Sequence, residues 1–154
     1  MIVVTGAAGF IGSNLVAELN DRGRTDIAVC DRLGDDGRWM NLRKRMFREF
    51  VFPEDLMASL AARHDITAVL HMGAISSTTA TDGDEIVQSN LQFSLGLLDW
   101  CALNAVPMVY ASSGATYGDG SNGFEDGFDF QRLRRLRPGL PPRNGTSVRV
   151  RDPA

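Results

Sequence analysis

The chain has 154 residues with 44% hydrophobic residues and a formal net charge of −3, which is typical of one globular domain and excludes a fibre, a disordered chain and a strongly basic nucleic-acid binder. No basic segment followed by an apolar run precedes the first predicted strand, and every apolar run is far shorter than the roughly 20 residues that cross a bilayer. We therefore expect a cytoplasmic protein outside the membrane. Cys30 and Cys101 lack metal-ligand spacing, so we expect reduced core thiols and no metal site.

The first predicted element is a β-branched strand at residues 2–5, which leads into three glycines and then into an apolar helix face. Gly6 can form the tight turn that leaves the strand, Gly9 lets the backbone approach a pyrophosphate, and Gly12 lets the helix pack closely. The free N–H groups at the start of that helix favour an anion. This order predicts a dinucleotide-binding site, with a plain strand-to-helix turn as the alternative.

A second strand is predicted at residues 27–30, and Asp31 follows it directly. An acidic residue about 20 positions past the glycines can accept hydrogen bonds from the adenosine ribose hydroxyls. Arg32 and Arg38 follow, and a cation there can pair with the 2′-phosphate of NADP, which favours NADP while leaving NAD open. The alternatives are a turn residue for Asp31 and a solvated loop for the two arginines.

The remaining pattern alternates strands with helices. We predict strands at 50–52, 68–71 and 108–111, and helices at 54–64 and from about 84 to 104. The inward stripe expected for the long helix consists of Ile86, Val87, Leu91, Leu95, Leu98 and Cys101. Because such alternation requires right-handed parallel crossovers, we predict an α/β fold, a doubly wound parallel sheet of the Rossmann type with strand order 3-2-1-4-5.

Several polar residues follow the predicted fourth strand, at the edge where open α/β sheets bind ligands. His71 at that strand end is expected to be packed or hydrogen-bonded rather than to act as a general base. The run Ser76 to Thr79 suits hydroxyl contacts to a sugar nucleotide or a phosphate, or else forms a flexible helix-entry loop. The amide of Asn90 can brace the neighbouring strands, or it can lie in solvent.

Two serines, Ser112 and Ser113, follow the predicted fifth strand. Ser113 can donate a hydrogen bond to an oxygen that develops charge during hydride transfer. The alternative is that the serines cap a turn. The chain has neither a G-x-S-x-G elbow nor a matched His/Asp pair, which excludes a serine hydrolase.

These segments together resemble the extended short-chain dehydrogenases/reductases, and among them the ADP-L-glycero-D-manno-heptose 6-epimerases of lipopolysaccharide-core biosynthesis, over residues 1–14, 31–33, 71–79 and 110–118. The resemblance covers about residues 1–130. It implies a bound NADP that removes hydride from C6 of the heptose and returns it to the opposite face. It also implies a nucleotide-sugar substrate, ADP-heptose, and a homo-oligomer for an intact enzyme.

The resemblance also implies residue roles. Ser113 matches the catalytic serine, and Phe10 and Ile11 would line the pyrophosphate site. The adenosine end would be held by Asp31, Arg32 and Arg38, and the middle of the cofactor by Met72, Gly73, Ala74, Ile75 and Ser76. Pro53 departs from the family, which can have a basic cofactor contact there.

The Tyr-x-x-x-Lys pair of that superfamily is missing, because no tyrosine follows Tyr117 and no lysine follows Lys44. Residues 131–154 contain seven arginines and one acid, whereas residues 1–130 contain nine basic and 18 acidic residues. We interpret 1–130 as an incomplete NAD(P)-binding Rossmann domain and 131–154 as an irregular basic tail from a frameshift or truncation, with a divergent tail as the alternative. The tail lacks interleaved aromatics, so nucleic-acid binding is not expected.

Without the tyrosine and lysine, we expect this chain to be inactive. The alternative functions are a non-catalytic NAD(P)-binding fragment and another nucleotide-sugar epimerase or dehydratase.

Overall fold

The computed structural model describes residues 1–77, 79–125, 129, 131 and 135. The chain divides after Ala111 into two units, Met1–Ala111 and Ser112–Ala154. Thr78 and, apart from Gln131 and Arg135, the predicted irregular tail lie outside the described residues. The division of the chain at residue 130 stays a prediction.

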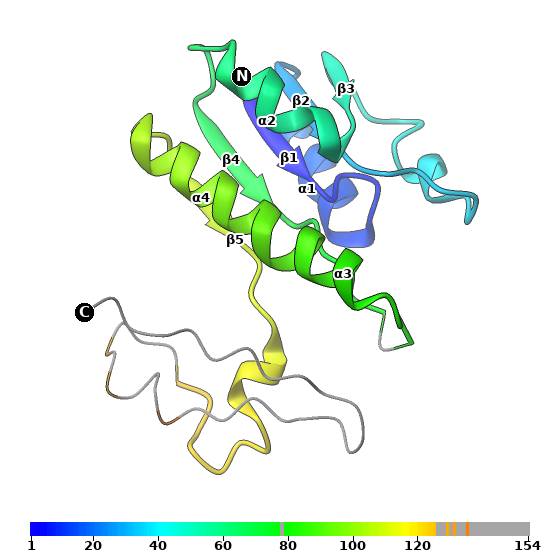
Figure 1. Cartoon of the computed structure of the whole chain (residues 1–154). Coiled ribbons are helices and arrows are strands. Elements are labelled where there is room, and N and C mark those ends of the chain that lie inside the picture. Colours follow the sequence, from blue (N-terminus) through cyan, green and yellow to red (C-terminus); the bar gives the residue numbers. More distant parts are fainter. Residues whose placement is uncertain (78, 126–128, 130, 132–134, 136–154) are drawn as a thin grey trace. The chain divides into compact units, whose positions relative to one another are not determined.

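The first unit contains a parallel sheet of five strands in the order β3-β2-β1-β4-β5 (Figure 1). The strands are β1 (Ile2–Thr5), β2 (Ile27–Cys30), β3 (Glu49–Val51), β4 (Ala68–His71) and β5 (Met108–Tyr110). The predicted doubly wound parallel sheet is therefore confirmed. Thr5 pairs with both Cys30 and His71, so the residues that follow these three strands emerge at one edge of the sheet.

Helices cover both faces of the sheet in the first unit (Figure 1). They are α1 (Phe10–Asp21), α2 (Pro53–Ala61), and a helical run made of α3 (Gly83–Ile86), the π-helical segment η2 (Val87–Gln92) and α4 (Phe93–Leu103). Val16 of α1 packs with Val4 on one face. Leu56 of α2 and Leu97 of α4 pack with Val3 on the other face. Successive strand residues point to opposite faces, which places Val3 and Val4 in separate cores.

The long helical run has the predicted extent but a different inward face. Leu97 is fully buried, whereas Leu95 and Leu98 are 49% and 52% exposed. Cys101 is buried as predicted, and Val87 is exposed. For Leu95 and Leu98 the π-helical segment is the physical reason, because its wider turns shift the phase of the residues that follow it. The predicted stripe is therefore wrong at Val87, Leu95 and Leu98.

The bounds of β3 and α2 differ from the prediction: both elements begin one residue earlier, β3 ends one residue earlier, and α2 ends three residues earlier. The strand ends at Val51, Phe52 is the N-cap of α2, and Pro53 takes its first helical position. Proline suits that position because its missing N–H would have no helical partner there. The helix ends at Ala61, before the predicted end at residue 64.

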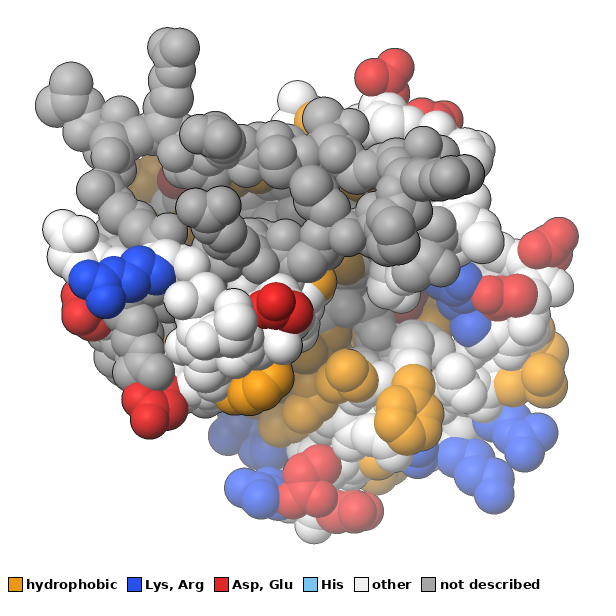
Figure 2. Space-filling model, turned by 90° about the horizontal axis from the view of Figure 1, so that it is seen from below, with side chains coloured by type: hydrophobic (Ala, Val, Ile, Leu, Met, Phe, Trp, Pro, Cys, Tyr) orange, Lys and Arg blue, Asp and Glu red, His pale blue; other side chains and the backbone are white. Residues whose placement is uncertain are grey.

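Both cysteines are free and buried, and burial raises the pKa of the Cys30 thiol to about 12. In the described part of the chain, no helix is long and apolar enough to cross a bilayer. The described residues also contain no group of three or more His, Cys, Asp or Glu side chains that could hold a metal ion. On the face drawn in Figure 2, acidic and basic side chains both border exposed hydrophobic ones.

Candidate cofactor-binding site

A pocket of about 360 Å³ opens at the carboxyl edge of the sheet in the first unit. Its walls come from the ends of β1 and β2, the segments that follow β2 and β4, the start of α2 and the helical run. The residues that line it are Thr5, Gly6, Cys30, Asp31, Arg32, Arg38, Pro53, Gly73, Ala74, Ile75, Glu85, Gln88, Ser89 and Phe93.

The glycines after β1 allow backbone segments to touch. Gly6 has a φ of +64°, and a Cβ there would lie 2.6 Å from the Gly73 backbone nitrogen. A Cβ at Gly12 would lie 2.1 Å from the Gly6 carbonyl oxygen. Helix α1 begins after Gly9 without a side-chain cap, which leaves first-turn N–H groups available for an anion. The tight turn and the close helix contact are thus observed, while the pyrophosphate contact of Gly9 stays a prediction.

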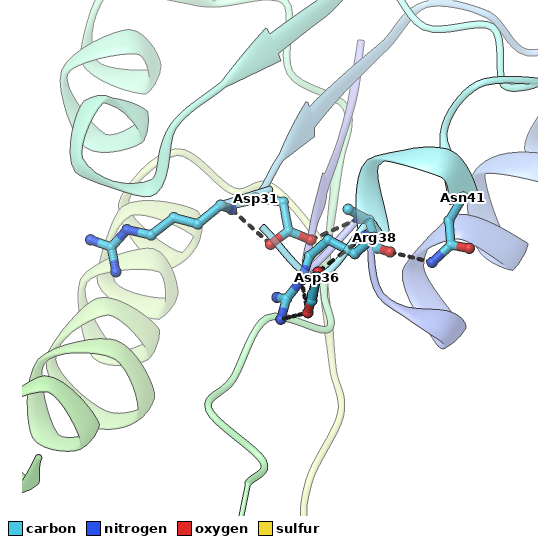
Figure 3. Close-up of polar contacts among 6 residues, drawn as sticks. Asp31, Asp36, Arg38 and Asn41 are labelled. Carbon is cyan, nitrogen blue, oxygen red and sulfur yellow. Dashed lines mark hydrogen bonds and ion pairs between the residues drawn. The ribbon is translucent and has the colours of Figure 1, made fainter. Parts of the chain in front are cut away.

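Asp31 joins the end of β2 to the glycine-rich turn (Figure 3). One carboxylate oxygen accepts a hydrogen bond from the Ala8 N–H at 2.7 Å, and the other accepts one from the Arg32 N–H at 2.7 Å. Asn41 donates to the Ala8 carbonyl oxygen at 2.7 Å. Each carboxylate oxygen can accept a second bond, so Asp31 can still receive a ribose hydroxyl at the pocket wall.

Both arginines that the sequence places near the adenosine end line the pocket, and both contact carboxylates of the chain itself. Arg38 forms an ion pair with Asp36 at 2.6 Å, visible in Figure 3, and its guanidinium lowers the pKa of Asp36 to about 2. Arg32 lies 3.4 Å from Glu54 and 3.7 Å from Glu85. A phosphate at this end would therefore compete with carboxylates for the two guanidinium groups. The sequence pattern did not predict these arginine–carboxylate pairs.

A chain of hydrogen bonds connects the ends of β1 and β4 with the helical run. The Thr5 hydroxyl accepts from the Gly73 N–H at 3.2 Å and contacts Nδ1 of His71. Nε2 of His71 lies 2.8 Å from the Ser94 hydroxyl, which donates to the Asn90 carbonyl oxygen at 2.9 Å. These directions assign a neutral His71 protonated on Nε2, because Thr5 then donates to Nδ1 and Ser94 accepts from Nε2.

His71 is 1% exposed, and burial lowers the pKa of its imidazole. Its ring stacks on Tyr110, with ring centroids 5.5 Å apart. A buried imidazole with a partner at each nitrogen supports the local packing, as the sequence predicted, and has no ring nitrogen left to accept a substrate proton.

The amide of Asn90 binds the backbone of Ile75 at both ends. Its oxygen accepts from the Ile75 N–H at 2.7 Å, and its nitrogen donates to the Ile75 carbonyl at 2.9 Å. Asn90 therefore braces the segment after β4 rather than lying in solvent, although it is absent from the pocket lining. In this way Asn90 positions Ile75, which lines the pocket.

Four other predicted cofactor residues are not among the residues that line the pocket. Phe10 and Ile11 form the first turn of α1 and are 84% and 57% exposed. Met72 is half-buried and Ser76 is exposed. Their contacts with a cofactor stay predictions.

Ser113 belongs to the second unit. Its hydroxyl accepts a hydrogen bond from the Ala115 N–H at 3.2 Å and caps the short helix η3 (Gly114–Tyr117). This is the turn-capping arrangement that the sequence left as the alternative. The catalytic role of Ser113 stays a prediction.

Half of the pocket lining had no predicted cofactor role: Thr5, Cys30, Pro53, Glu85, Gln88, Ser89 and Phe93. Thr5 could have been predicted from the sequence, since it is a polar residue at the end of an apolar strand and directly precedes Gly6. Gln88 and Ser89 could not have been predicted in this way, because their position in the pocket depends on the π-helical segment.

Comparison with known proteins relates this chain to the NAD dependent epimerase/dehydratase family. The sequence profile of the NAD dependent epimerase/dehydratase family matches residues 2–138. The ADP-L-glycero-D-manno-heptose-6-epimerase of Fusobacterium nucleatum is 40% identical over 141 residues, which are 90% of this chain and 42% of that protein. The predicted resemblance is therefore confirmed, and the chain spans less than half the length of this relative.

Two solved structures are similar to the chain. The ADP-L-glycero-D-manno-heptose-6-epimerase of Helicobacter pylori matches with a TM-score of 0.65 and 26% identity over 86% of this chain and 44% of that one. A short-chain dehydrogenase/reductase superfamily protein from Agrobacterium tumefaciens with bound NAD matches with a TM-score of 0.59 and 36% identity over 76% of this chain and 34% of that one.

Proposed function

Because the chain belongs to the NAD dependent epimerase/dehydratase family, we propose that its first unit binds NAD or NADP in the pocket at the carboxyl edge of the sheet. The observation that carries this proposal is the contact between Gly6 and Gly73, where a Cβ on Gly6 would lie 2.6 Å from backbone. Two glycine-containing segments meet there beside an uncapped helix N-terminus. Such a cradle suits a pyrophosphate, which needs close backbone approach and N–H donors.

At the adenosine end, Asp31 would accept hydrogen bonds from the ribose, and its position is supported by its bonds to the Ala8 and Arg32 N–H groups. Arg32 and Arg38 also line the pocket and favour NADP, because a guanidinium can bind the 2′-phosphate through two N–H donors. The segment from Met72 to Ser76 would contact the middle of the cofactor.

For the longer protein that such a domain serves, we propose inversion of C6 of an ADP-heptose, on the strength of the 40% identity to the Fusobacterium nucleatum epimerase. The cofactor, when bound, supplies an acceptor and donor of hydride. Ser113 would orient the reacting oxygen by donating a hydrogen bond. A homo-oligomer is part of this proposal.

The chain itself would bind the cofactor without turning over substrate, since it lacks the Tyr-x-x-x-Lys pair. Two alternatives remain within the proposal. One is a fragment whose only property is NAD(P) binding, and the other is a different nucleotide-sugar epimerase or dehydratase, since solved UDP-glucose 4-epimerases also share the fold.

Calorimetric titration of the purified chain with NAD⁺ and with NADP⁺ tests the proposal. We expect both to bind, NADP⁺ more tightly, and we expect Asp31→Asn to weaken both because the ribose loses a charged acceptor. Asp21→Asn is the matched control, because Asp21 is exposed at the end of α1. Failure of the folded native chain to bind either cofactor would overturn the proposal.

A further inference from the structure

We propose that Asp36 sets how tightly this chain binds a nucleotide with a 2′-phosphate, because it holds the Arg38 guanidinium to which that phosphate would bind. This inference rests on the cofactor site proposed above and identifies a residue that determines its specificity. Asp36 was not among the predicted site residues, and it does not belong to the pocket lining.

The contact between the two side chains uses one whole edge of the guanidinium. Nε of Arg38 lies 3.0 Å from each carboxylate oxygen of Asp36, and Nη2 lies 2.6 Å from Oδ2. Figure 3 shows the carboxylate and the guanidinium facing each other, joined by dashed lines. The opposite edge, which carries Nη1, keeps donors for a second anion. A 2′-phosphate can therefore reach Arg38, but it meets a cation that Asp36 already neutralises.

The position of Asp36 is built into the loop. Its Oδ1 accepts a hydrogen bond from the Arg38 backbone N–H at 3.0 Å, as in a turn closed by an aspartate side chain. Gly37 between them has a φ of +78°, which favours glycine. The carboxylate is thus held by the backbone, and pairing with Arg38 requires less ordering of flexible side chains than an ordinary surface pair. Arg38 also lowers the pKa of Asp36 to about 2, so the carboxylate is charged at neutral pH.

The second arginine that lines the pocket does not compensate for this. Arg32 lies within 4 Å of Glu54 and Glu85, so each of the two arginines already faces at least one carboxylate. A 2′-phosphate carries nearly two negative charges at neutral pH, whereas the 2′-hydroxyl of NAD carries none. Competition from Asp36 therefore weakens the binding of NADP and leaves that of NAD unchanged.

The substitution Asp36→Asn isolates this effect. The asparagine oxygen can still accept the Arg38 N–H bond, so the turn is kept while the negative charge is removed. We expect the dissociation constant for NADP⁺ to fall about twofold to fivefold, the range that exposed ion pairs produce. The dissociation constant for NAD⁺ should stay unchanged. Both are measured by calorimetry on the full chain.

Asp35→Asn is the matched control, because it makes the same change in net charge at the adjacent exposed residue. It should change the ratio of the two dissociation constants much less than Asp36→Asn does. Adding Arg38→Gln to Asp36→Asn should abolish the gain for NADP⁺, since the freed guanidinium is then absent.

The outcomes separate this inference from the proposed function. If the native chain binds both cofactors and Asp36→Asn leaves their ratio unchanged, the inference is wrong and the cofactor site stands. An equal gain from Asp35→Asn, or a gain that survives Arg38→Gln, also overturns it. If the folded native chain binds neither cofactor, both the proposed function and the inference fail.

Discussion

Asn90 holds both backbone polar groups of Ile75, with its amide oxygen 2.7 Å from the Ile75 nitrogen and its amide nitrogen 2.9 Å from the Ile75 oxygen. Ile75 lines the pocket, and Asn90 lies in the π-helical segment η2. The two bonds therefore fix the pocket wall that follows β4 to a helical run on the face of the sheet. Ser94 connects the same run to His71, so the wall depends on contacts between residues 15 to 23 positions apart.

Asn90→Ala should destabilise the chain and loosen the segment around Ile75. Loss of the amide leaves two half-buried backbone groups without their partner, at a cost of about 1–3 kcal/mol. Urea unfolding measures the change, and hydrogen exchange of the Ile75 N–H should become faster. Asn104→Ala is the control, because the Asn104 amide makes a single exposed bond to the Trp100 carbonyl. Equal losses from the two variants would contradict the bracing role of Asn90.

The stability of the chain should fall as the pH drops below about 6.5, in part because of His71. Burial lowers the pKa of this imidazole in the folded state, so between its folded pKa and its unfolded pKa the unfolded chain binds a proton that the folded chain does not. The free energy of unfolding is thus highest above the unfolded pKa and falls with decreasing pH.

His71→Gln should reduce that pH dependence in urea unfolding between about pH 5 and pH 7.5. The overall stability of the variant is also expected to be lower, so the readout is the slope with pH rather than the absolute value. His64→Gln removes the exposed histidine and should keep the slope. If His71→Gln kept the native slope of stability with pH, another titratable group would be the cause of that slope.

Two glycine-to-alanine changes in helices should have opposite signs. Gly12→Ala places a Cβ 2.1 Å from the Gly6 carbonyl oxygen, and such overpacking costs about 1–3 kcal/mol. Gly96→Ala meets nothing closer than the Met57 Cε at 3.9 Å, so it should stabilise α4 by up to about 1 kcal/mol. Thermal or urea unfolding compares them. A neutral Gly12→Ala would show that α1 can move away from the glycine-rich turn.

The chain should not epimerise ADP-heptose, even with NADP⁺ added. A general base of the missing kind contributes about 10²–10⁴-fold to such a step, and His71 is buried with partners at both ring nitrogens. Proton NMR of the C6 configuration detects the reaction, with an intact epimerase as the positive control. Conversion at a rate near that of the control would show that another residue of this chain accepts the proton.

The order of the strands and the edge at which the site lies could be predicted because their signals are local. Apolar runs such as residues 27–30 and 68–71 alternate with helix-period segments, and parallel strands joined by right-handed crossovers leave few arrangements. The backbone contacts of the glycines after β1 could also be predicted from a local signal. A residue without a Cβ is favoured where φ is positive or where two backbone segments approach closely. The position of Asp31 in the pocket could be predicted because it follows the glycine-rich turn by about 20 residues.

Other features depend on contacts that no local pattern records. The inward face of the long helical run was wrong at Leu95 and Leu98, because a π-helical segment shifts the helical phase. The bond between Thr5 and His71 joins residues 66 positions apart, and the bond between Asn90 and Ile75 joins residues 15 positions apart. Periodicity and spacing determine which elements form and in which order, since these follow from the chain's own backbone and hydrophobic pattern. Only the tertiary structure decides which polar groups meet at the pocket, because burial selects a partner for each of them from distant parts of the chain.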